Sequence, residues 1–453
     1  MCLFRWMVTV AALLLLSVPL AHAEMKISGA LSNQFRVEVP QGNDEEWDVG
    51  MALSTFDLIG RATNEERSAR LFVNTDLRYD PTGVFEDDLE WRLREAYGGF
   101  YSDYFSFELG KRIYAWGTAD EFNPTDLLNP EDMRWFVSVD KTDRKLGVFS
   151  ANATLSYGGF SLQGVVVPVF EPTMLPAEDS RWLPWQLDRL YAVINGFSQY
   201  VDYRPDVRPE LNLGNATYAA QFKGTIGPVD IAAVYFDGFD PLPTFAIDMN
   251  TDAADLLSGG KALFIRQEYQ RYQAYGGGFA FAVGSVSIRG EGAYYSPRYY
   301  LYDIDESLLD VDNDLAAYNA LVGLEGHEWR VRKPSWSAAG GFDWHQGTQL
   351  YVNVQYVHTQ LLDYEPGLVE NENEGMVTMK LNTAWLEDDL QIGANGVYNV
   401  FHGDWWAKPY VRYNLTPDLL AEIGGQLYDG REETRFGEFA KNDFLYTLVK
   451  YSF

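Results

Sequence analysis

The chain has 453 residues, of which 47% are hydrophobic, 22% charged and 15% aromatic, with 40 glycines and one cysteine. This composition excludes a disordered chain, a collagen-like repeat and a small disulfide scaffold. The formal net charge of −30 argues against nucleic-acid binding, because a protein that neutralises phosphates needs a surplus of basic residues. The mean hydropathy of −0.23 is low for a bundle of membrane-spanning helices, although a membrane barrel hides its apolar residues in alternation.

The first 23 residues have the pattern of a secretory signal peptide. Arg5 comes before an apolar run from Met7 to Leu16, and Ala21-His22-Ala23 has the small-x-small form of a cleavage site. The run is shorter than the roughly 20 residues that a membrane-spanning helix needs, so a signal peptide is favoured over an anchor. The sequence therefore predicts export, with cleavage after Ala23.

The mature chain offers little for catalysis. Cys2 leaves with the signal peptide, which removes disulfides, thiolate metal sites and a cysteine nucleophile. No Gly-x-Ser-x-Gly, phosphate-binding glycine loop or His-Glu-x-x-His motif occurs, and the remaining histidines are not spaced as metal ligands. We expect no catalytic residue, no metal and no cofactor, although a Ser-His pair assembled from distant residues stays open.

Alternating apolar and polar residues recur from Ala23 to the end of the chain, which is typical of strands with one apolar face. Dividing the chain where Gly, Pro, Asn and Asp interrupt the alternation gives 18 candidate strands. They span 26–39, 48–61, 67–79, 89–100, 104–115, 145–157, 160–169, 214–223, 229–237, 263–283, 286–297, 335–345, 348–361, 375–386, 389–400, 405–415, 418–428 and 442–453.

The connections between these strands alternate between short and long. The long ones include 116–144, 170–213, 238–262, 298–334 and 362–374. This strict order disfavours a soluble sandwich, and no repeat of roughly 40 residues indicates a propeller. A sheet can cross hydrocarbon only if it closes on itself. The sequence therefore predicts an all-β fold: a closed antiparallel transmembrane β-barrel of about 18 strands (16–18), with long extracellular loops and short periplasmic turns, forming one domain over residues 24–453.

Aromatic residues gather where the candidate strands end, as in the interfacial girdles of membrane barrels. The residues assigned to a girdle are Tyr97, Tyr101, Phe105, Tyr157, Phe160, Tyr351, Trp385 and Tyr413. The alternative is that they belong to the core of a soluble protein.

The chain ends in Phe453, preceded by Tyr451 and alternating apolar positions. This segment resembles the C-terminal strand of Gram-negative outer-membrane β-barrels. The resemblance implies an outer-membrane location, contact with outer-membrane lipid, and recognition of Tyr451 and Phe453 by the barrel-assembly machinery. Phe444 and Leu448 depart from it, because they fall on the face expected to be lumenal.

The connection 116–144 holds two Asn-Pro-x-Asp sequences, and each could start a helical turn with Asn as the cap and Pro at the first position. The residues expected to form a constriction loop are Trp116, Gly117, Asp120, Asn123, Pro124, Asp126, Asn129, Pro130, Asp132 and Arg134. With Trp-Gly-x-x-Asp followed by Asn-Pro-x-Asp, this block is similar to a porin-like family of outer-membrane proteins of unknown function. The resemblance implies a barrel in the outer membrane, and it implies little about the solute. Long, structured loops after an early strand can fold into a barrel and narrow it, so the connection 116–144 is expected to enter the lumen.

An arginine ladder is predicted on the lumenal face, because an arginine facing lipid at the bilayer midplane would cost about 2–4 kcal/mol. The predicted pore-lining residues are Arg36, Arg70, Arg78, Arg92, Arg94 and Arg112. They could pair with the loop acids and hold the loop in place, or they could remain free and attract anionic solutes. The loop acids in question are Asp120, Asp126, Glu131 and Asp132.

Two further loop features have open interpretations. Trp182, Trp185, Tyr191, Tyr200 and Tyr203 could bind ring-shaped or apolar solutes, or could pack within their own loop. The acidic runs 303–314 and 370–374 could bind Ca²⁺, or could form a solvated surface without the spacing of an EF-hand.

The sequence therefore predicts a channel for passive diffusion of small hydrophilic solutes, with a preference for anionic ones. Barrels of 16–18 strands leave an aqueous lumen, so no chemistry is required. The alternatives are a channel specific for hydrophobic or polymeric anionic compounds, and a structural sheath or loop-mediated binding protein with a blocked lumen. Small-molecule solutes are the expected partners, nucleic acid is not, and a homo-oligomer is open by analogy with porins.

Overall fold

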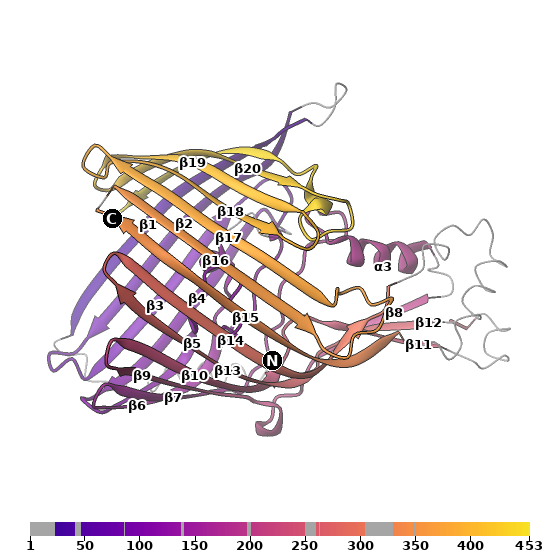
Figure 1. Ribbon diagram of the computed structural model, residues 1–453, viewed down its shortest axis with the longest axis horizontal. Helices are drawn as coiled ribbons and strands as arrows, with labels where there is room; N and C mark the ends of the chain where they lie inside the picture. Colours follow the sequence, from indigo (N-terminus) through magenta and orange to yellow (C-terminus); the bar gives the residue numbers. More distant parts are fainter. Residues whose placement is uncertain are drawn as a thin grey trace.

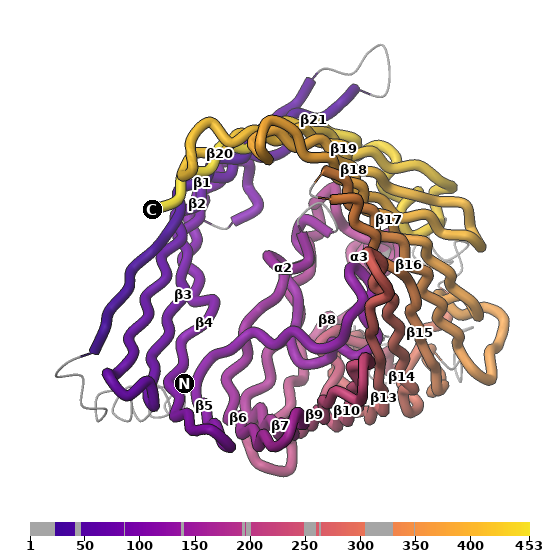
Figure 2. Tube along the Cα trace, turned by 60° about the vertical axis from the view of Figure 1, so that its left-hand side comes forward, coloured from indigo at the N-terminus to yellow at the C-terminus, as the bar shows by residue number. Residues whose placement is uncertain are grey.

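The computed structural model describes residues 23–40, 47–85, 87–136, 140–196, 201–249, 260–261, 263–303, 329–347 and 349–453. Within these residues, 18 strands form a single antiparallel sheet, in which each strand pairs with its neighbour along the chain. β1 also pairs with β21, from Ala30 opposite Ser452 to Glu38 opposite Phe444, and this pairing closes the barrel. The tilted strands and the closed ring are visible in Figures 1 and 2. The predicted fold class is confirmed.

The strands of the barrel are β1 (Glu24–Glu38), β2 (Asp48–Thr63), β3 (Ala69–Tyr79), β4 (Leu89–Tyr101), β5 (Phe105–Arg112), β6 (Val148–Tyr157), β7 (Phe160–Val167), β9 (Thr217–Ile226), β10 (Val229–Phe239), β13 (Arg271–Val283), β14 (Val286–Leu301), β15 (Arg330–Gln346), β16 (Leu350–Leu361), β17 (Asn373–Trp385), β18 (Leu390–Asn399), β19 (Trp405–Thr416), β20 (Leu419–Asp429) and β21 (Phe444–Ser452). The other elements are α2 (Lys141–Arg144), α3 (Trp185–Gly196), the 3₁₀ turns η2 (Leu213–Asn215) and η4 (Gly437–Phe439), and the loop strands β8 (Val201–Val207), β11 (Thr244–Met249) and β12 (Leu263–Glu268).

One candidate strand, 263–283, was wrong as a single element. The structure divides it into β12 and β13, and β12 leaves the barrel to pair with β11 and β8 in a separate three-stranded sheet. Gln270 marks the break, because its backbone oxygen accepts from Asp240 N at 2.9 Å and its side chain accepts from Tyr299 N at 2.6 Å. Figure 1 shows this small sheet beside α3 at the long-loop end.

The two faces of the barrel wall differ in polarity. Large apolar side chains such as Trp91 (66% exposed), Phe279 (44%) and Ile423 (59%) lie on the outer face. In β21 the outward positions include Leu445, Val449 and Tyr451, about half exposed, while Phe444 is 1% exposed on the inner face. The alternation predicted for this segment is therefore confirmed, and Phe444 points inward, where the loop residue Trp182 packs against it.

Three of the predicted girdle aromatics lie on the inner face instead. A bulge between β3 and β4 shifts the register at Asn74 and Thr75, which reverses the faces of the later β4 residues. Tyr101 Oη consequently donates to Glu108 at 2.5 Å, and Tyr97 lies under the Arg112 guanidinium. Tyr351 also faces inward and donates to Asp343 at 2.7 Å.

Some predictions fall outside the described residues. They are the signal peptide up to residue 22, Tyr200, and the acidic run from 304 to 314. The prediction of one domain from 24 to 453 remains a prediction. Across the described ranges, no helix has the length and apolar character needed to cross a membrane.

Candidate functional site: the loop that crosses the barrel

Residues 113–147 form a loop that leaves β5, crosses the inside of the barrel and returns to β6; we call it the crossing loop. Figure 2 shows its helix α2 inside the ring of strands. Asn129 ties its two ends together: the side-chain oxygen accepts from Tyr114 N at 2.7 Å, and the amide nitrogen donates to Leu146 O at 2.7 Å. Asn129 therefore starts no helical turn, contrary to prediction, because its side chain is used between the loop ends.

The first Asn-Pro-x-Asp sequence forms a tight turn without continuing into a helix. Asn123 Oδ1 accepts from Thr125 N at 3.0 Å, and Asn123 Nδ2 donates to Trp116 O at 2.9 Å. Gly117 lies next to this turn with φ of +82°, a backbone conformation that favours glycine. The motif residues therefore shape the loop through local hydrogen bonds.

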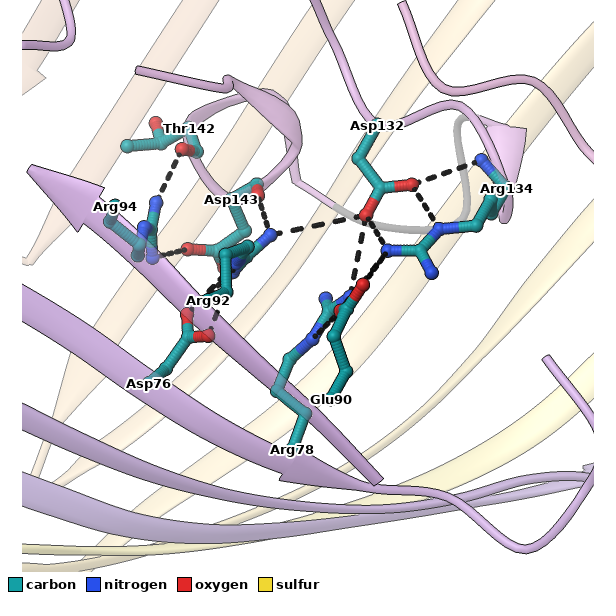
Figure 3. A network of polar contacts seen from close by, with 9 residues as sticks. All are labelled: Asp76, Arg78, Glu90, Arg92, Arg94, Asp132, Arg134, Thr142 and Asp143. Carbon is teal, nitrogen blue, oxygen red and sulfur yellow. Dashed lines mark hydrogen bonds and ion pairs between the residues drawn. The ribbon is translucent and has the colours of Figure 1, made fainter. Parts of the chain in front are cut away.

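The crossing loop meets the β3–β4 wall through Asp132, as Figure 3 shows. Asp132 is 3% exposed and contacts Arg78 at 3.4 Å, Arg134 at 2.7 Å and Arg92 at 3.9 Å. Glu90 of β4 completes the cluster by pairing with Arg78 and Arg134. Burial alone would raise the pKa of Asp132, but hydrogen bonds from Arg134 and the charge of Arg78 lower it below its ordinary value.

A second contact on the same wall involves α2. Arg94 donates to Thr142 O at 2.9 Å and pairs with Asp143 at 3.3 Å. Arg92 is held mainly by Asp76 of β3, at 2.6 Å. These pairs place opposite charge beside Arg92 and Arg94.

The crossing loop also contacts the opposite wall. Glu291 of β14 accepts from the backbone N–H groups of Thr118 at 2.7 Å and Ala119 at 3.4 Å. Asp120 pairs with Arg289 at 2.8 Å and with Lys380 at 3.4 Å. The loop is thus fixed to strands on both sides of the lumen.

The pairing of the loop acids differs from the predicted latch. Asp132 contacts predicted ladder residues, whereas Asp120 pairs with the opposite wall. Asp126 pairs with Lys145 inside the loop, and Glu131 pairs with Arg144 at 3.1 Å. Asp126 and Glu131 are therefore used for ion pairs within the loop, and neither pairs with a ladder arginine among the described residues.

The remaining predicted pore-lining arginines lie on the inner face of their strands. Arg36 is 3% exposed and its guanidinium lies 4.6 Å from the Phe444 ring centre. Arg112 pairs with Glu108. Arg70 is exposed over the Tyr101 ring at 4.5 Å, and no acidic partner is found for it among the described residues.

Sequence reasoning missed the contacts on the far wall. Arg289 and Glu291 are two residues apart in a strand, so they share a face, and charged residues at this spacing could have indicated a lumenal pair. Lys408 of β19, which pairs with Asp140 at 3.3 Å, gave no such signal because its partner lies 268 residues away.

The loop before β9 also folds inward. Trp182 is 4% exposed and packs against Phe439, Tyr428 and Phe444 with ring centres 5.6 to 6.4 Å apart. Its indole is therefore used for packing between loops. A chamber of about 1190 Å³ lies between α3, the long-loop ends of β14–β16 and the loop after β20. No group of metal-ligating side chains occurs in the part of the chain that the structure describes.

Comparison with known proteins supports the fold. No family model matches this sequence. A search of curated proteins also finds no match. Among solved structures, the chain is similar to OpdK of Pseudomonas aeruginosa with vanillate (9% identity, 95% of this chain and 98% of that chain, TM-score 0.52). It is also similar to OccK9 (OpdG) of the same organism (10% identity, 95% and 98%, TM-score 0.51). These neighbours are outer-membrane porins, and at this identity the likeness shows the barrel fold alone.

Proposed function

We propose that this chain is an outer-membrane channel for passive diffusion of small hydrophilic solutes, with no catalytic role. The observation that carries the proposal is the closed ring of 18 strands, because barrels of this size generally leave an aqueous lumen. The exposed apolar outer face suits lipid. We further propose that signal-directed export brings the chain to the outer membrane of a Gram-negative cell, where the assembly machinery recognises Tyr451 and Phe453.

We propose that any preference for anions rests on Arg70 and its neighbour Arg61, which stacks on Phe72. Both side chains are exposed, and neither has an acidic partner among the described residues. The other ladder arginines on β3–β5 contribute less, because Asp76, Glu90, Glu108, Asp132 and Asp143 offset their charge.

Planar-bilayer recording of the refolded mature chain tests both statements. We expect an ohmic conductance, and an anion preference that falls when Arg61→Ala and Arg70→Ala are combined. The matched control is Arg412→Gln with Glu422→Gln, which removes a lumenal pair held at 2.7 Å without changing net charge. Silent bilayers would contradict the channel and favour a sheath or binding protein whose lumen the crossing loop blocks. An unchanged reversal potential would contradict the role of the two arginines.

A substrate-specific channel is the second candidate, and the outer chamber favours it. The chamber is lined by apolar residues such as Leu187, Leu190 and Leu301, and by seven acidic residues against four arginines. This balance disfavours polymeric anions as the substrate. Block of the conductance by one class of solute would support this candidate. Membership of the family with the Trp-Gly-x-x-Asp motif stays part of the proposal.

A further inference from the structure

A line of hydrogen-bonded polar side chains crosses the inner wall below the crossing loop and ends at an unpaired donor. Asn152 Nδ2 donates to Glu108 at 2.7 Å, and Gln163 Nε2 donates to Asn152 at 3.0 Å. The oxygen of Gln163 accepts from Trp116 Nε1 at 3.0 Å. On the next strand Gln221 lies directly opposite Gln163. The Gln163 amide forms its hydrogen bonds with Trp116 and Asn152, and none with the Gln221 amide nitrogen.

Gln221 is 3% exposed, and its Nε2 has no hydrogen-bond partner in the described ranges. A buried amide donor left without an acceptor costs about 1–3 kcal/mol, so such groups normally have a partner. The hydroxyl of Thr118, in the crossing loop, is likewise buried without a partner among the described residues. Two unused polar groups from different parts of the chain therefore lie in one region.

Both residues line a cavity of about 670 Å³ between the crossing loop and the wall formed by β7, β9, β10 and β13. This volume falls within the roughly 300–1,000 Å³ range of small-molecule sites. The cavity exists because Ala232 and Gly278 are cross-strand neighbours on the inner face and leave space under Gly117 of the loop. The short turns at one end of the barrel also line it, so it opens toward that end.

The charged groups around the cavity are of both signs. Lys223 lies two residues after Gln221 on the same face of β9, and Asp103 and Asp230 also line the cavity. Asp230 accepts a hydrogen bond from Thr225 at 2.6 Å and keeps further acceptor capacity. The wall thus offers an amide and an ammonium as donors, and carboxylates as acceptors.

We propose that this cavity binds a neutral polyhydroxylated solute, such as a sugar. A hydroxyl group both donates and accepts, so it satisfies Gln221 and Lys223 as well as Asp230. A carboxylate solute would meet Asp103 and Asp230 at unfavourable Coulomb energy, and an ammonium solute would leave the Gln221 donor unpaired. The site is separate from the arginines discussed above, and binding to it does not require that the barrel conduct.

The test compares three solutes with one carbon skeleton and different charge: glucose, gluconate and glucosamine. Saturation-transfer NMR on the full mature chain in detergent micelles measures binding without relying on conductance. We expect glucose to bind more tightly than either charged relative. Gln221→Leu should weaken glucose binding about tenfold, which corresponds to about 1.4 kcal/mol.

Asn382→Leu is the matched control, because Asn382 is also an inner-face amide but lies on β17, away from the cavity residues. It should leave glucose binding unchanged. Ala232→Met fills the cavity and keeps Gln221, so it should also abolish glucose binding. Resistance of the variant to SDS shows that its barrel remains folded. Equal binding of the three solutes, or an equal loss in Gln221→Leu and Asn382→Leu, would overturn the site. If the bilayers show no conductance but glucose still binds, the proposed channel function is contradicted and the proposed binding site is supported.

Discussion

Asp132 is one of the loop residues that contact the β3–β4 wall. One buried carboxylate faces Arg78, Arg92 and Arg134, so it offsets charge on strands and loop together. Removing one partner from a buried ion pair leaves the others uncompensated, which typically costs 3–5 kcal/mol. A single side chain can therefore link the position of the loop to the charge of the lumen.

Asp132→Asn should raise the anion preference of the channel and lower the stability of the folded barrel by about 3–5 kcal/mol. Reversal potentials in a salt gradient and urea unfolding of the detergent-folded protein measure the two effects. Asp143→Asn is the control, because Asp143 is 59% exposed and an exposed pair contributes about 0–1 kcal/mol. Equal effects of the two substitutions would show that burial is not what matters here.

Gly117 is required by space as well as by its backbone. A Cβ atom on this residue would overlap Asn123 Oδ1, Glu291 Oε2 and Thr125 Oγ1. Gly117→Ala should therefore detach the loop segment from β14 and increase conductance. Gly83→Ala is a matched control, since Gly83 has a similar φ of +87° with no atom within 4 Å of the added Cβ. If both variants conduct equally, backbone strain alone accounts for the change.

At the scale of elements, the loop before β9 and the loop after β20 are joined at the start of α3. Glu438, the middle residue of η4, accepts from Trp185 N at 2.7 Å. Burial raises the pKa of Glu438 to about 8, against the opposing effects of this hydrogen bond and of Arg435. In the folded loop Glu438 therefore keeps its proton. In the opened loop Glu438 would release this proton above its ordinary pKa near 4.5.

The sign of the pH dependence follows from this difference. Between pH 4.5 and 8 the closed loop binds more protons than the open one, so its stability falls as pH rises. Hydrogen exchange at the amides of α3, corrected for intrinsic rates, should show about 50-fold more opening at pH 8 than at pH 6. Glu438→Gln should remove this dependence. Protection that rises with pH would contradict the assignment.

The barrel strands were predictable because outward apolar and inward polar residues alternate in each of them. Local departures were not. The bulge in β4 places Tyr97 and Tyr101 on the inner face, and no residue type in β4 indicates the bulge. β12 was joined to β13 because both have a period of two, and only pairing partners distant in sequence separate them. The loop motif indicated a folded loop, but the far-wall partners of Asp120 required the three-dimensional structure.

At the scale of the whole molecule, the last residue belongs to the outer surface of the closed ring. Phe453 is 51% exposed, and its ring stacks near Phe56 at 6.2 Å and Tyr451 at 6.5 Å. Its backbone exchanges two hydrogen bonds with Gly29, at 2.9 and 3.0 Å. The terminal aromatic thus sits at the seam between β1, β2 and β21.

Phe453→Ala should keep the backbone pairing but reduce the fraction of folded protein in the outer membrane several-fold, because the proposed recognition by the assembly machinery needs the aromatic ring. Heat-modifiable migration on SDS gels measures this fraction in cells. Phe453→Tyr should restore it. Refolding of Phe453→Ala into detergent from urea should remain efficient, and a failure there would assign the ring to stability instead.

The pairing of β1 with β21 joins two segments that are made at opposite times during synthesis. The first strand cannot complete its hydrogen bonds until the last has been made, so its edge stays unpaired until then. A chain that ends before β21 would form an open sheet with two unpaired edge strands that cannot pair with each other. The ring therefore closes only when the whole chain up to β21 is present.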